Sequence, residues 1–431
     1  MSEQVANTQV RRADGTHRVV ITGMGAVTPT GVGVPALRDA VMGKRCCVRP
    51  ITHFDASDYE VRIAAEVPDF DATEYGLTKK EARRFERFVQ YALIAADEAM
   101  AQAGVNMDDE DPTRSAVVFG AGIGGIDELQ KGFRTLDEKG PKRVNPLFIP
   151  TMIGNMAAGH IAIRYGMRGE CIDVSTACAT GAHNIGSPVR SIRHGYCDLA
   201  LAGGSEESVN PICIAGFTNL GALTHAGDPQ AASMPFDVRR SGFVAGEGGA
   251  VLVLESLEHA LARGAKPIAE ITGFGSTGDA YHMTAPDPEG EGVVRAMRIA
   301  LEEGGFTPAD LGHFNAHGTG THANELTESK ALRALCGEEA GLKVPVCSVK
   351  GTTGHTLGAA GAVEAIVTAL SVANDCVPPT AGFETPDPEA PANVLAEPLE
   401  NYKQKVALSN SLGFGGHNAC LAISPYEVAA E

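Results

Sequence analysis

The stretch Ile21-Thr22-Gly23-Met24-Gly25 returns later in the chain as Ile271-Thr272-Gly273-Phe274-Gly275. Each copy ends a β-rich run, and each is followed by a long segment that leads into the pattern of an amphipathic helix. A segment that recurs in this way indicates a duplicated structural unit. The sequence therefore predicts two related halves, residues 18–262 and 263–431, which share one core because no low-complexity linker separates them.

The rest of the chain alternates strand-like and helix-like segments. The pattern predicts strands at 18–22, 115–119, 199–202, 250–254, 344–349 and 406–410, and helices at 81–103, 292–303 and 358–373. The first strand is expected to end at Thr22, because the glycine, threonine and proline that follow favour a turn. This alternation predicts an α/β fold, with parallel or mixed sheets that are covered on both faces.

Charge and cysteine content exclude several classes of function. The 431 residues carry a net charge of −18, whereas nucleic acids and anionic membranes are bound by basic surfaces. The ten cysteines are scattered without a C-x-x-C pair or a metal-ligand spacing, so we expect reduced thiols, no metal and a cytoplasmic protein. Residues 1–17 lack the apolar region of a signal peptide and are expected to form a disordered extension. The apolar run 357–373 contains Glu364, so no membrane span is predicted.

One cysteine lies where a buried strand would turn into a helix of small residues, in Val174-Ser-Thr-Ala-Cys178-Ala-Thr-Gly-Ala-His183. Unpaired N–H groups and the positive dipole end of a helix N-terminus stabilise a thiolate, and such sites lower the pKa of a cysteine. Cys178 is therefore a candidate nucleophile. The alternative is a cysteine that packs in the core as a small apolar side chain, as most cysteines do.

Two histidines occupy equivalent settings in the second half of the chain. One lies in Asn315-Ala-His317-Gly-Thr-Gly-Thr321, and the other in Lys350-Gly-Thr-Thr-Gly-His355-Thr-Leu-Gly. Each is accompanied by a strand and a turn rich in glycine and threonine, which would expose an imidazole at a strand end. Either could be a structural histidine on its own, but the repeated arrangement favours a functional role together with the cysteine.

Two glycine-rich turns follow other strands. Asn410-Ser-Leu-Gly-Phe414-Gly-Gly416 could offer N–H groups to an oxyanion, and its alternative is a plain left-handed turn. Gly120-Ala-Gly-Ile123-Gly-Gly125 satisfies the G-x-G-x-x-G pattern of dinucleotide-binding dehydrogenases. The acidic residues at the expected distance lie in the loop-like segment 137–143, so we favour close backbone approach here, with Ile123 projecting into the neighbouring space.

The segments around Cys178, His317, His355 and Phe414 resemble the motifs of β-ketoacyl-acyl carrier protein synthases, condensing enzymes of the thiolase superfamily. The resemblance is closest to the type II enzymes and covers residues 18–423. It also includes Asn155-Met-Ala-Ala-Gly-His, Met234-Pro-Phe-Asp-Val-Arg-Arg-Ser-Gly-Phe-Val-Ala-Gly-Glu-Gly-Gly and Asp279-Ala-Tyr-His-Met-Thr. It implies a thiolase-like five-layered α/β/α/β/α sandwich of two duplicated halves, and a homodimer.

The resemblance also implies catalytic roles. It places the family's triad on Cys178, His317 and His355, and its lysine on Lys350. An acyl group would move from a carrier's pantetheine to the cysteine, and two neutral imidazoles would then stabilise the enolate that forms when a malonyl thioester loses CO₂. The N–H groups of Cys178 and Phe414 are the expected oxyanion hole. This chemistry requires no metal and no redox cofactor.

Other residues are assigned to the substrate and the carrier. Phe414 is expected to be a gate beside the nucleophile, with Ile123 at the depth of the acyl pocket. Thr319 and Thr321 are expected to bind substrate, and Glu364 to support Lys350. Acyl carrier proteins are acidic, so docking needs a basic face. The resemblance places that face, which could otherwise be merely solvated, on a helix with the basic residues Lys79, Lys80, Arg83, Arg84 and Arg87.

The predicted function is the condensation of malonyl-acyl carrier protein with a cysteine-bound acyl chain, which elongates fatty acids by two carbons. A polyketide ketosynthase of the same fold is the alternative. A non-catalytic chain-length partner would keep the fold but lose the cysteine. Type III condensing enzymes, with one histidine and one asparagine, and thiolases, with a second cysteine, match less well.

Overall fold

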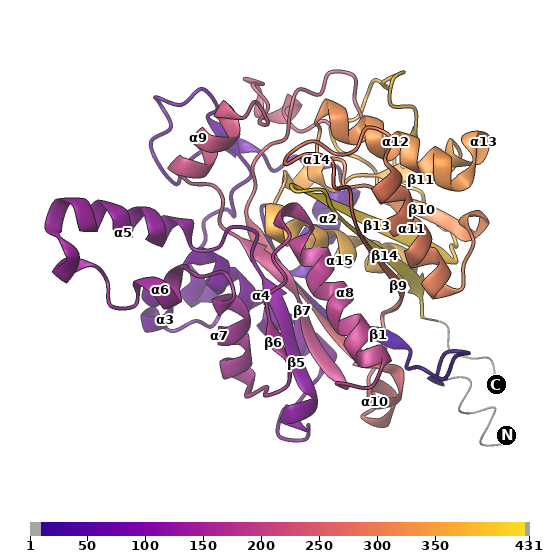
Figure 1. Ribbon diagram of the computed structural model, residues 1–431, viewed down its shortest axis with the longest axis horizontal. Coiled ribbons are helices and arrows are strands. Elements are labelled where there is room, and N and C mark those ends of the chain that lie inside the picture. Colours follow the sequence, from indigo (N-terminus) through magenta and orange to yellow (C-terminus); the bar gives the residue numbers. More distant parts are fainter. Residues whose placement is uncertain (1–9, 427–431) are drawn as a thin grey trace.

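A computed structural model describes residues 10–426 and divides into two halves of the same topology (Figure 1). The first half contains β1 (Val19–Thr28), β5 (Ser115–Gly120), β6 (Cys171–Ile172), β7 (Leu199–Glu206) and β8 (Gly248–Ser256). The second contains β9 (Ala269–Gly278), β10 (Leu311–Asn315), β11 (Pro345–Cys347), β13 (Val406–Gly413) and β14 (His417–Pro425). The order β6-β5-β7-β8-β1 in one half is matched by β11-β10-β13-β14-β9 in the other. This match is the duplication that the repeated pentapeptide predicts.

Both half-sheets are mixed, and they are joined at one edge. β5 pairs in parallel with β6 and β7, whereas β8 pairs antiparallel with β7 and β1. The second half repeats these directions. β1 and β9 pair only at Val20 with Glu270 and at Ile21 with Ala269. The sheets therefore share a short seam, and beyond it they face each other across helices.

The repeated glycines lie within strands. β1 continues to Thr28, so the predicted strand end at Thr22 is wrong. The reason is that helix α4 (Arg87–Ala103) lies directly on β1, and helix α11 (Glu291–Gly304) lies in the same way on β9. A Cβ at Gly23, Gly25, Gly273 or Gly275 would collide with the carbonyl oxygens of Ala99, Ala95, Ala300 and Ala296, respectively. The repeated glycines thus allow α4 and α11 to lie close to β1 and β9, and they do not form a turn.

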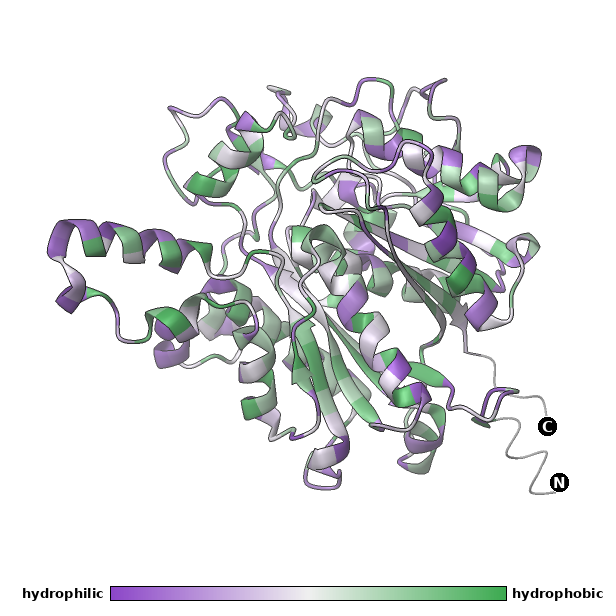
Figure 2. Ribbon diagram, in the orientation of Figure 1, coloured by the Kyte–Doolittle hydropathy of each residue, from purple (hydrophilic) through white to green (hydrophobic). Residues whose placement is uncertain are grey.

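The three largest apolar cores lie between five layers of helices and strands. The central core lies around α8 (Thr180–Arg193) and α15 (Ala360–Ala373), which touch strands of both sheets. A second core lies under α4 and α7 (Met156–Tyr165), on the outer face of the first sheet. A third lies under α11 and α12 (His322–Cys336), on the outer face of the second. The fold is therefore the thiolase-like α/β/α/β/α sandwich. Its inner strands consist largely of hydrophobic residues, which are green in Figure 2.

The two central helices touch at their first turns. A Cβ at Gly181 would lie 2.7 Å from the amide nitrogen of Ala362, and a Cβ at Gly361 would lie 2.6 Å from that of Ala182. Glycine at both positions lets the two helix backbones touch. This contact brings the N-termini of both helices to one place between the halves.

The predicted helix at 81–103 is two helices. α3 (Lys79–Arg84) begins with a capping box formed by Thr78 and Glu81, and the chain is extended at Phe85 and Glu86 before α4 begins. The break lets Phe85 pack against the core under α4.

The remaining helices are α2 (Val34–Met42), α5 (Ile126–Lys139), α6 (Phe148–Met152), α9 (Pro211–Asn219), α10 (Leu257–Ala262), α13 (Glu338–Gly341) and α14 (Lys350–Thr353). The short strands are β2 (Gly31–Val32), β3 (Arg49–Pro50), β4 (Ile63–Ala64) and β12 (Asn393–Val394).

Part of the N-terminal extension is packed on the body. Arg11 pairs with His17 in a bridge and with Glu258 in an ion pair of 2.8 Å. Arg12 donates a hydrogen bond to the carbonyl oxygen of Thr272. The prediction of disorder is therefore wrong for residues 10–17, while residues 1–9 lie outside the described chain. Within 10–426, no helix combines the length and the apolar character needed to cross a membrane.

Candidate active site

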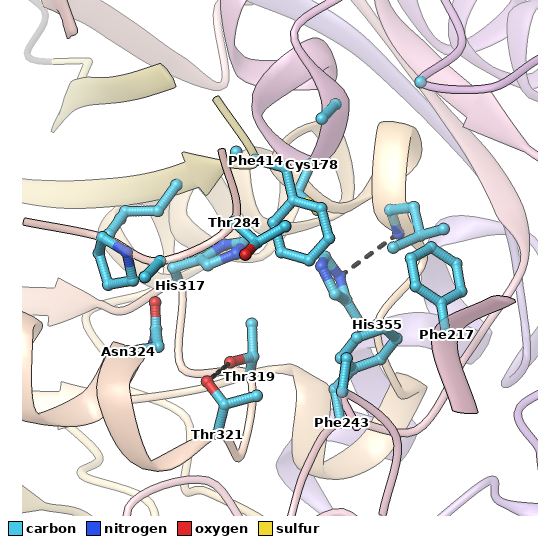
Figure 3. A pocket seen from close by; sticks show the side chains of 18 of the residues that line it. Cys178, Phe217, Phe243, Thr284, His317, Thr319, Thr321, Asn324, His355 and Phe414 are labelled. Carbon is cyan, nitrogen blue, oxygen red and sulfur yellow. Dashed lines mark hydrogen bonds between the residues drawn. The ribbon is translucent and has the colours of Figure 1, made fainter. Parts of the chain in front are cut away.

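A cavity of about 380 Å³ opens where the starts of α8 and α15 meet. Cys178, His317, His355 and Phe414 all line it, so residues from both halves converge there (Figure 3). The ligand atoms of the cysteine and the two histidines lie within 4.8 Å of one another. The structure thus brings together the nucleophile and histidines that the sequence predicts.

Cys178 lies in the 3₁₀ turn Ala177–Ala179, which leads into α8. The residue before it, Ala177, has φ = 51°, a left-handed conformation that is uncommon for a residue with a Cβ. Such strain is concentrated at functional sites. The turn points the thiol into the cavity, although Cys178 as a whole is only 8% exposed.

The pKa of Cys178 is shifted opposite to the expected direction. Burial raises the pKa of this thiol to about 12, and the negative charge of Glu206 raises it further. Lys350 and the N–H groups of Phe414 and Cys178 itself act in the other direction. Loss of water around the sulfur outweighs the helix terminus, so the thiol is protonated in the resting site. The two N–H groups near the sulfur are the pair expected to form the oxyanion hole.

Both histidines are neutral hydrogen-bond donors toward the cavity. Burial lowers the pKa of His317 and of His355 well below 6.5, and the nearby Lys350 lowers both further. His355 Nδ1 accepts from the N–H of Leu357 at 3.3 Å, and Lys350 Nζ lies 3.3 Å from His317 Nδ1. A neutral imidazole that accepts at Nδ1 carries its hydrogen on Nε2. In residues 10–426, His355 Nε2 has no hydrogen-bond partner.

Lys350 links the two histidine segments. It begins α14, and its Nζ donates to the carbonyl oxygen of His317 and forms an ion pair with Glu364 of α15. Burial raises the pKa of Glu364 to about 7, against the opposite effect of Lys350. The predicted partners are therefore together, and the ammonium group anchors the loop that contains His317.

Two further carboxylates hold that loop, and sequence reasoning missed them. Glu328 accepts from the backbone N–H groups of His317 and Gly318, each at 2.8 Å. Glu325 accepts from Gly320 N at 2.8 Å. Both lie on α12, directly after the loop, so acidic residues early in the next helix were the available signal.

The predicted substrate residues all line the cavity. Thr319 and Thr321 lie across the cavity from Cys178 and share a hydrogen bond of 2.9 Å (Figure 3). Phe414 lies beside the cysteine. Ile123 also lines the cavity and is 41% exposed in the single chain. Its position at the depth of the acyl pocket stays a prediction.

Further side chains around the cavity were missed. Phe217 and Phe243 form its apolar side, and the ring of Phe243 lies 5.2 Å from that of His355. Asn324 and Glu206 also line the cavity. Phe243 belongs to the segment Met234–Gly249 that carries the resemblance, which was the one available signal.

The basic residues divide into two groups. Lys79, Lys80, Arg83 and Arg84 are all exposed on α3. Arg87 begins α4 instead, and its Nη1 lies 3.7 Å from Glu247, whose side chain is 1% exposed. Arg87 therefore does not belong to the exposed basic face, because the break at Phe85 turns it inward.

The donor groups decide what the site can hold. Two imidazoles and a thiol are also the donor types of a zinc site. Here, however, both Nδ1 atoms are occupied, which leaves N–H groups directed at the cavity and favours an anionic oxygen over a cation. The loop Gly120–Gly125 is occupied as well, because Glu206 accepts from three of its N–H groups. These groups are not free to bind a pyrophosphate, which counts against the dehydrogenase alternative.

Comparisons with known proteins agree with this geometry. Residues 16–260 match the β-ketoacyl synthase N-terminal domain and residues 268–384 the C-terminal domain. A 3-oxoacyl-[acyl-carrier-protein] synthase 2 of Vibrio harveyi is 44% identical over 94% of this chain and 98% of its own length.

Two solved structures show the same fold. A β-ketoacyl synthase from Burkholderia phymatum is 34% identical with a TM-score of 0.87, over 95% of this chain and all of that one. A type II polyketide ketosynthase, solved in complex with its acyl-carrier protein, is 30% identical with a TM-score of 0.87 over the same shares. With both domain matches and this identity along its length, the chain belongs to the β-ketoacyl synthase family.

Proposed function

We propose that this chain is a 3-oxoacyl-acyl carrier protein synthase of type 2, which condenses malonyl-acyl carrier protein with an acyl chain held on Cys178. One observation carries the proposal: the thiol faces two imidazoles that line the same cavity and accept hydrogen bonds at Nδ1, so that each has its hydrogen on Nε2. A thiol supplies the covalent acyl carrier, and two neutral donors suit an enolate oxygen. The identity to enzymes named for this reaction supports the same activity.

In the first half-reaction, Cys178 Sγ attacks the thioester carbonyl of the acyl carrier. The new sulfur–carbon bond replaces the bond to pantetheine, and the thiol proton ends on the departing pantetheine sulfur. The tetrahedral oxyanion accepts hydrogen bonds from the N–H groups of Cys178 and Phe414. Losing one donor of this kind costs about 2.7 to 4 kcal/mol of transition-state stabilisation.

In the second half-reaction, the malonyl thioester loses CO₂. The electron pair of the broken carbon–carbon bond becomes an enolate, whose oxygen accepts from Nε2–H of His317 and His355. The enolate carbon then attacks the acyl carbonyl, and the bond to Cys178 breaks. The released thiolate takes up one proton, which restores the resting thiol and balances the reaction.

Intact-mass analysis tests this proposal. Incubation with acyl-loaded carrier proteins of several chain lengths should add one acyl group, which peptide mapping assigns to Cys178. The exposed Cys171 is the internal control for adventitious acylation. No adduct, or an adduct on Cys171 alone, would overturn the proposal.

A polyketide ketosynthase remains the second candidate, because such an enzyme is among the structural neighbours. The higher identity to the fatty-acid enzyme favours a single elongation. Purified enzyme with acyl- and malonyl-loaded carriers, and with no reductase, should therefore stop after one two-carbon extension. Products extended repeatedly without reduction would favour the polyketide assignment.

The carrier is proposed to dock on α3. Four exposed cations, Lys79, Lys80, Arg83 and Arg84, lie on one short helix of a chain whose net charge is −18. Such a local basic patch can attract an acidic partner despite the overall repulsion. The double variant Lys80→Glu, Arg84→Glu should raise KM for carrier-bound substrate but not for a free pantetheine thioester. The matched control reverses the exposed Lys266 and Arg298, and equal effects on both substrates would refute docking here.

We propose that the enzyme acts as a homodimer. β6 is an edge strand of the first half-sheet, and the arm formed by α5 and α6 projects from the body (Figure 1). Large apolar side chains are exposed on that arm, with Phe133 at 60% and Ile149 at 56%. A second copy would cover them. Light scattering should give twice the chain mass, and Phe133→Asp should shift the protein toward the monomer.

A cytoplasmic location is part of the same proposal. All ten cysteines are free in the structure, as in proteins kept in a reducing compartment.

A further inference from the structure

Glu206 is a buried carboxylate that joins the two halves beside the cavity. It ends β7 and has no exposed surface. Its Oε2 accepts from the N–H groups of Gly122 at 2.9 Å and Gly358 at 3.1 Å. Its two oxygens also accept from Ile123 and Gly124, each at 3.2 Å. Four backbone donors, three from the first half and one from the second, therefore meet on one side chain.

Both segments held by this carboxylate contact the reaction cavity. The Gly122–Gly124 loop carries Ile123, which forms part of the cavity wall. Gly358 follows Leu357, whose N–H sets the tautomer of His355. A Cβ at Gly122 would lie 2.7 Å from Glu206 Oε2, and a Cβ at Gly358 would lie 2.8 Å from it. Glycine at both positions makes room for the carboxylate.

The contact between Glu206 and Gly358 lies at a position that is equivalent to that of Cys178 in the first half. Gly358 is the middle residue of the 3₁₀ turn Leu357–Ala359 at the start of α15, as Cys178 is the middle residue of the turn at the start of α8. Each turn begins with a residue of positive φ, 46° at Leu357 and 51° at Ala177. Glu206 therefore binds the helix start of the second half at the position where the first half carries its reactive sulfur.

We propose that Glu206 is a positioning residue for the condensation, which ties the Ile123 wall of the acyl cavity to the turn that orients His355. The proposal rests on the proposed function of this site. A hydrogen bond to a charged group is stronger than one between neutral groups, so the carboxylate holds this turn more firmly than an amide could. Movement of either segment is then transmitted to the other.

The charge of Glu206 gives the test a second readout. Cys178 and Cys213 are titratable groups that face this carboxylate, and Cys178 also faces Lys350, His317 and His355. Burial raises the pKa of Glu206 to about 7, although its N–H partners favour the ionised form. In that form it raises the pKa of the Cys178 thiol. Removing the charge should therefore make the thiol easier to ionise.

The experiment compares Glu206→Gln with Glu66→Gln. Glu66 is a matched control, because it is also buried and accepts backbone N–H groups, from Thr52 and His53, but it does not line the cavity. Decarboxylation of a malonyl thioester reports on the histidines, and iodoacetamide alkylation of Cys178 at pH 8 to 9 reports on the thiol. Glu206→Gln should slow decarboxylation at least about tenfold, the usual effect of losing one charge-assisted hydrogen bond, and should speed alkylation at least about threefold.

Glu206→Asp separates position from charge. It keeps the carboxylate but is one methylene shorter, so it should slow decarboxylation while leaving the alkylation profile near that of the wild type. It also carries the test if the Gln variant does not fold. Wild-type decarboxylation in Glu206→Asp, or equal behaviour of Glu206→Gln and Glu66→Gln, would overturn the proposal. Alkylation needs no carrier, and an acyl adduct on the wild type tests the proposed function separately, so the two failures are distinguishable.

Discussion

Replacement of Lys350 by methionine should destabilise the fold by an amount that grows with pH above 7. Lys350 Nζ and Glu364 form an ion pair in which both side chains are 2% exposed. Methionine has a similar length and no charge, so the change leaves the carboxyl of Glu364 buried without its partner. A carboxyl in that position stays protonated rather than ionised.

The expected magnitude follows from the pKa of Glu364. In the wild type, burial raises it to about 7, from 4.5 for the unfolded chain. Between pH 4.5 and 7 the folded wild type and the folded variant both keep this proton, so their difference in stability is constant. Above pH 7 the wild type releases the proton while the variant retains it, and each further pH unit costs the variant about 1.4 kcal/mol. From pH 7 to 9 the extra loss is therefore roughly 2 to 3 kcal/mol.

Urea unfolding at pH 7, 8 and 9 measures this effect. In this range both active-site histidines are neutral, so they do not contribute to the slope. The control pair is Glu364→Gln with the double variant Lys350→Met, Glu364→Gln, which has no carboxyl to titrate. The difference within that pair should not change with pH. A pH-independent cost of Lys350→Met, or the same slope in the control pair, would refute the reasoning.

Three other outcomes are expected. Cys178→Ala should lose the acyl adduct in intact-mass analysis but keep malonyl decarboxylation, because the histidines that bind the enolate remain; loss of both would contradict the division of roles. Alkylation of Cys178 by iodoacetamide should speed up about tenfold per pH unit from pH 8 to 10, since burial raises the pKa of the thiol to about 12; a plateau below pH 9 would argue against a buried, protonated thiol. Gly23→Ala should lower the free energy of unfolding by about 3 kcal/mol, the upper end of the usual cost of overpacking, because its Cβ would collide with Ala99 O. At Gly216 nothing lies within 4 Å, so Gly216→Ala should instead stabilise α9 by up to about 1 kcal/mol in the same urea assay.

The duplication and the central residues of the site could be predicted from the sequence, because both are marked by short local motifs. Glycine turns mark the ends of strands, and the repeated pentapeptide marks equivalent strands. The role of the glycines that follow Thr22 could not be predicted from the sequence. Gly23 and Gly25 could equally form a turn or let a helix lie on a strand, and only the tertiary packing of α4 on β1 decides between them.

The direction of the pKa shift of Cys178 could not be predicted from the sequence for a related reason. A helix N-terminus is a local feature and predicts a lower pKa, whereas desolvation depends on every segment that covers the sulfur. Those segments include Phe414 from the end of the chain and Glu206 from the end of β7. Glu206 itself follows a predicted strand in the sequence, but nothing there indicates that it meets a loop from residues 122–124 and a helix start near residue 358.

The protonated thiol and the two neutral imidazoles show where the site stabilises negative charge during the reaction. The positive charge of Lys350 favours a thiolate at Cys178, but burial of the sulfur outweighs it. The two histidines are neutral and direct their hydrogens into the cavity. In the proposed reaction, negative charge appears first on the acyl oxyanion, then on the enolate, and reaches the sulfur when the product forms and the bond to Cys178 breaks. The N–H groups of Cys178 and Phe414 lie near the first and last of these charges, and the two histidines near the second. Each half of the fold thus supplies the start of one helix. The start of α8 carries the nucleophile, and the start of α15 carries the turn that orients His355. The close contact of these helices at Gly181 and Gly361 keeps both groups within reach of one substrate.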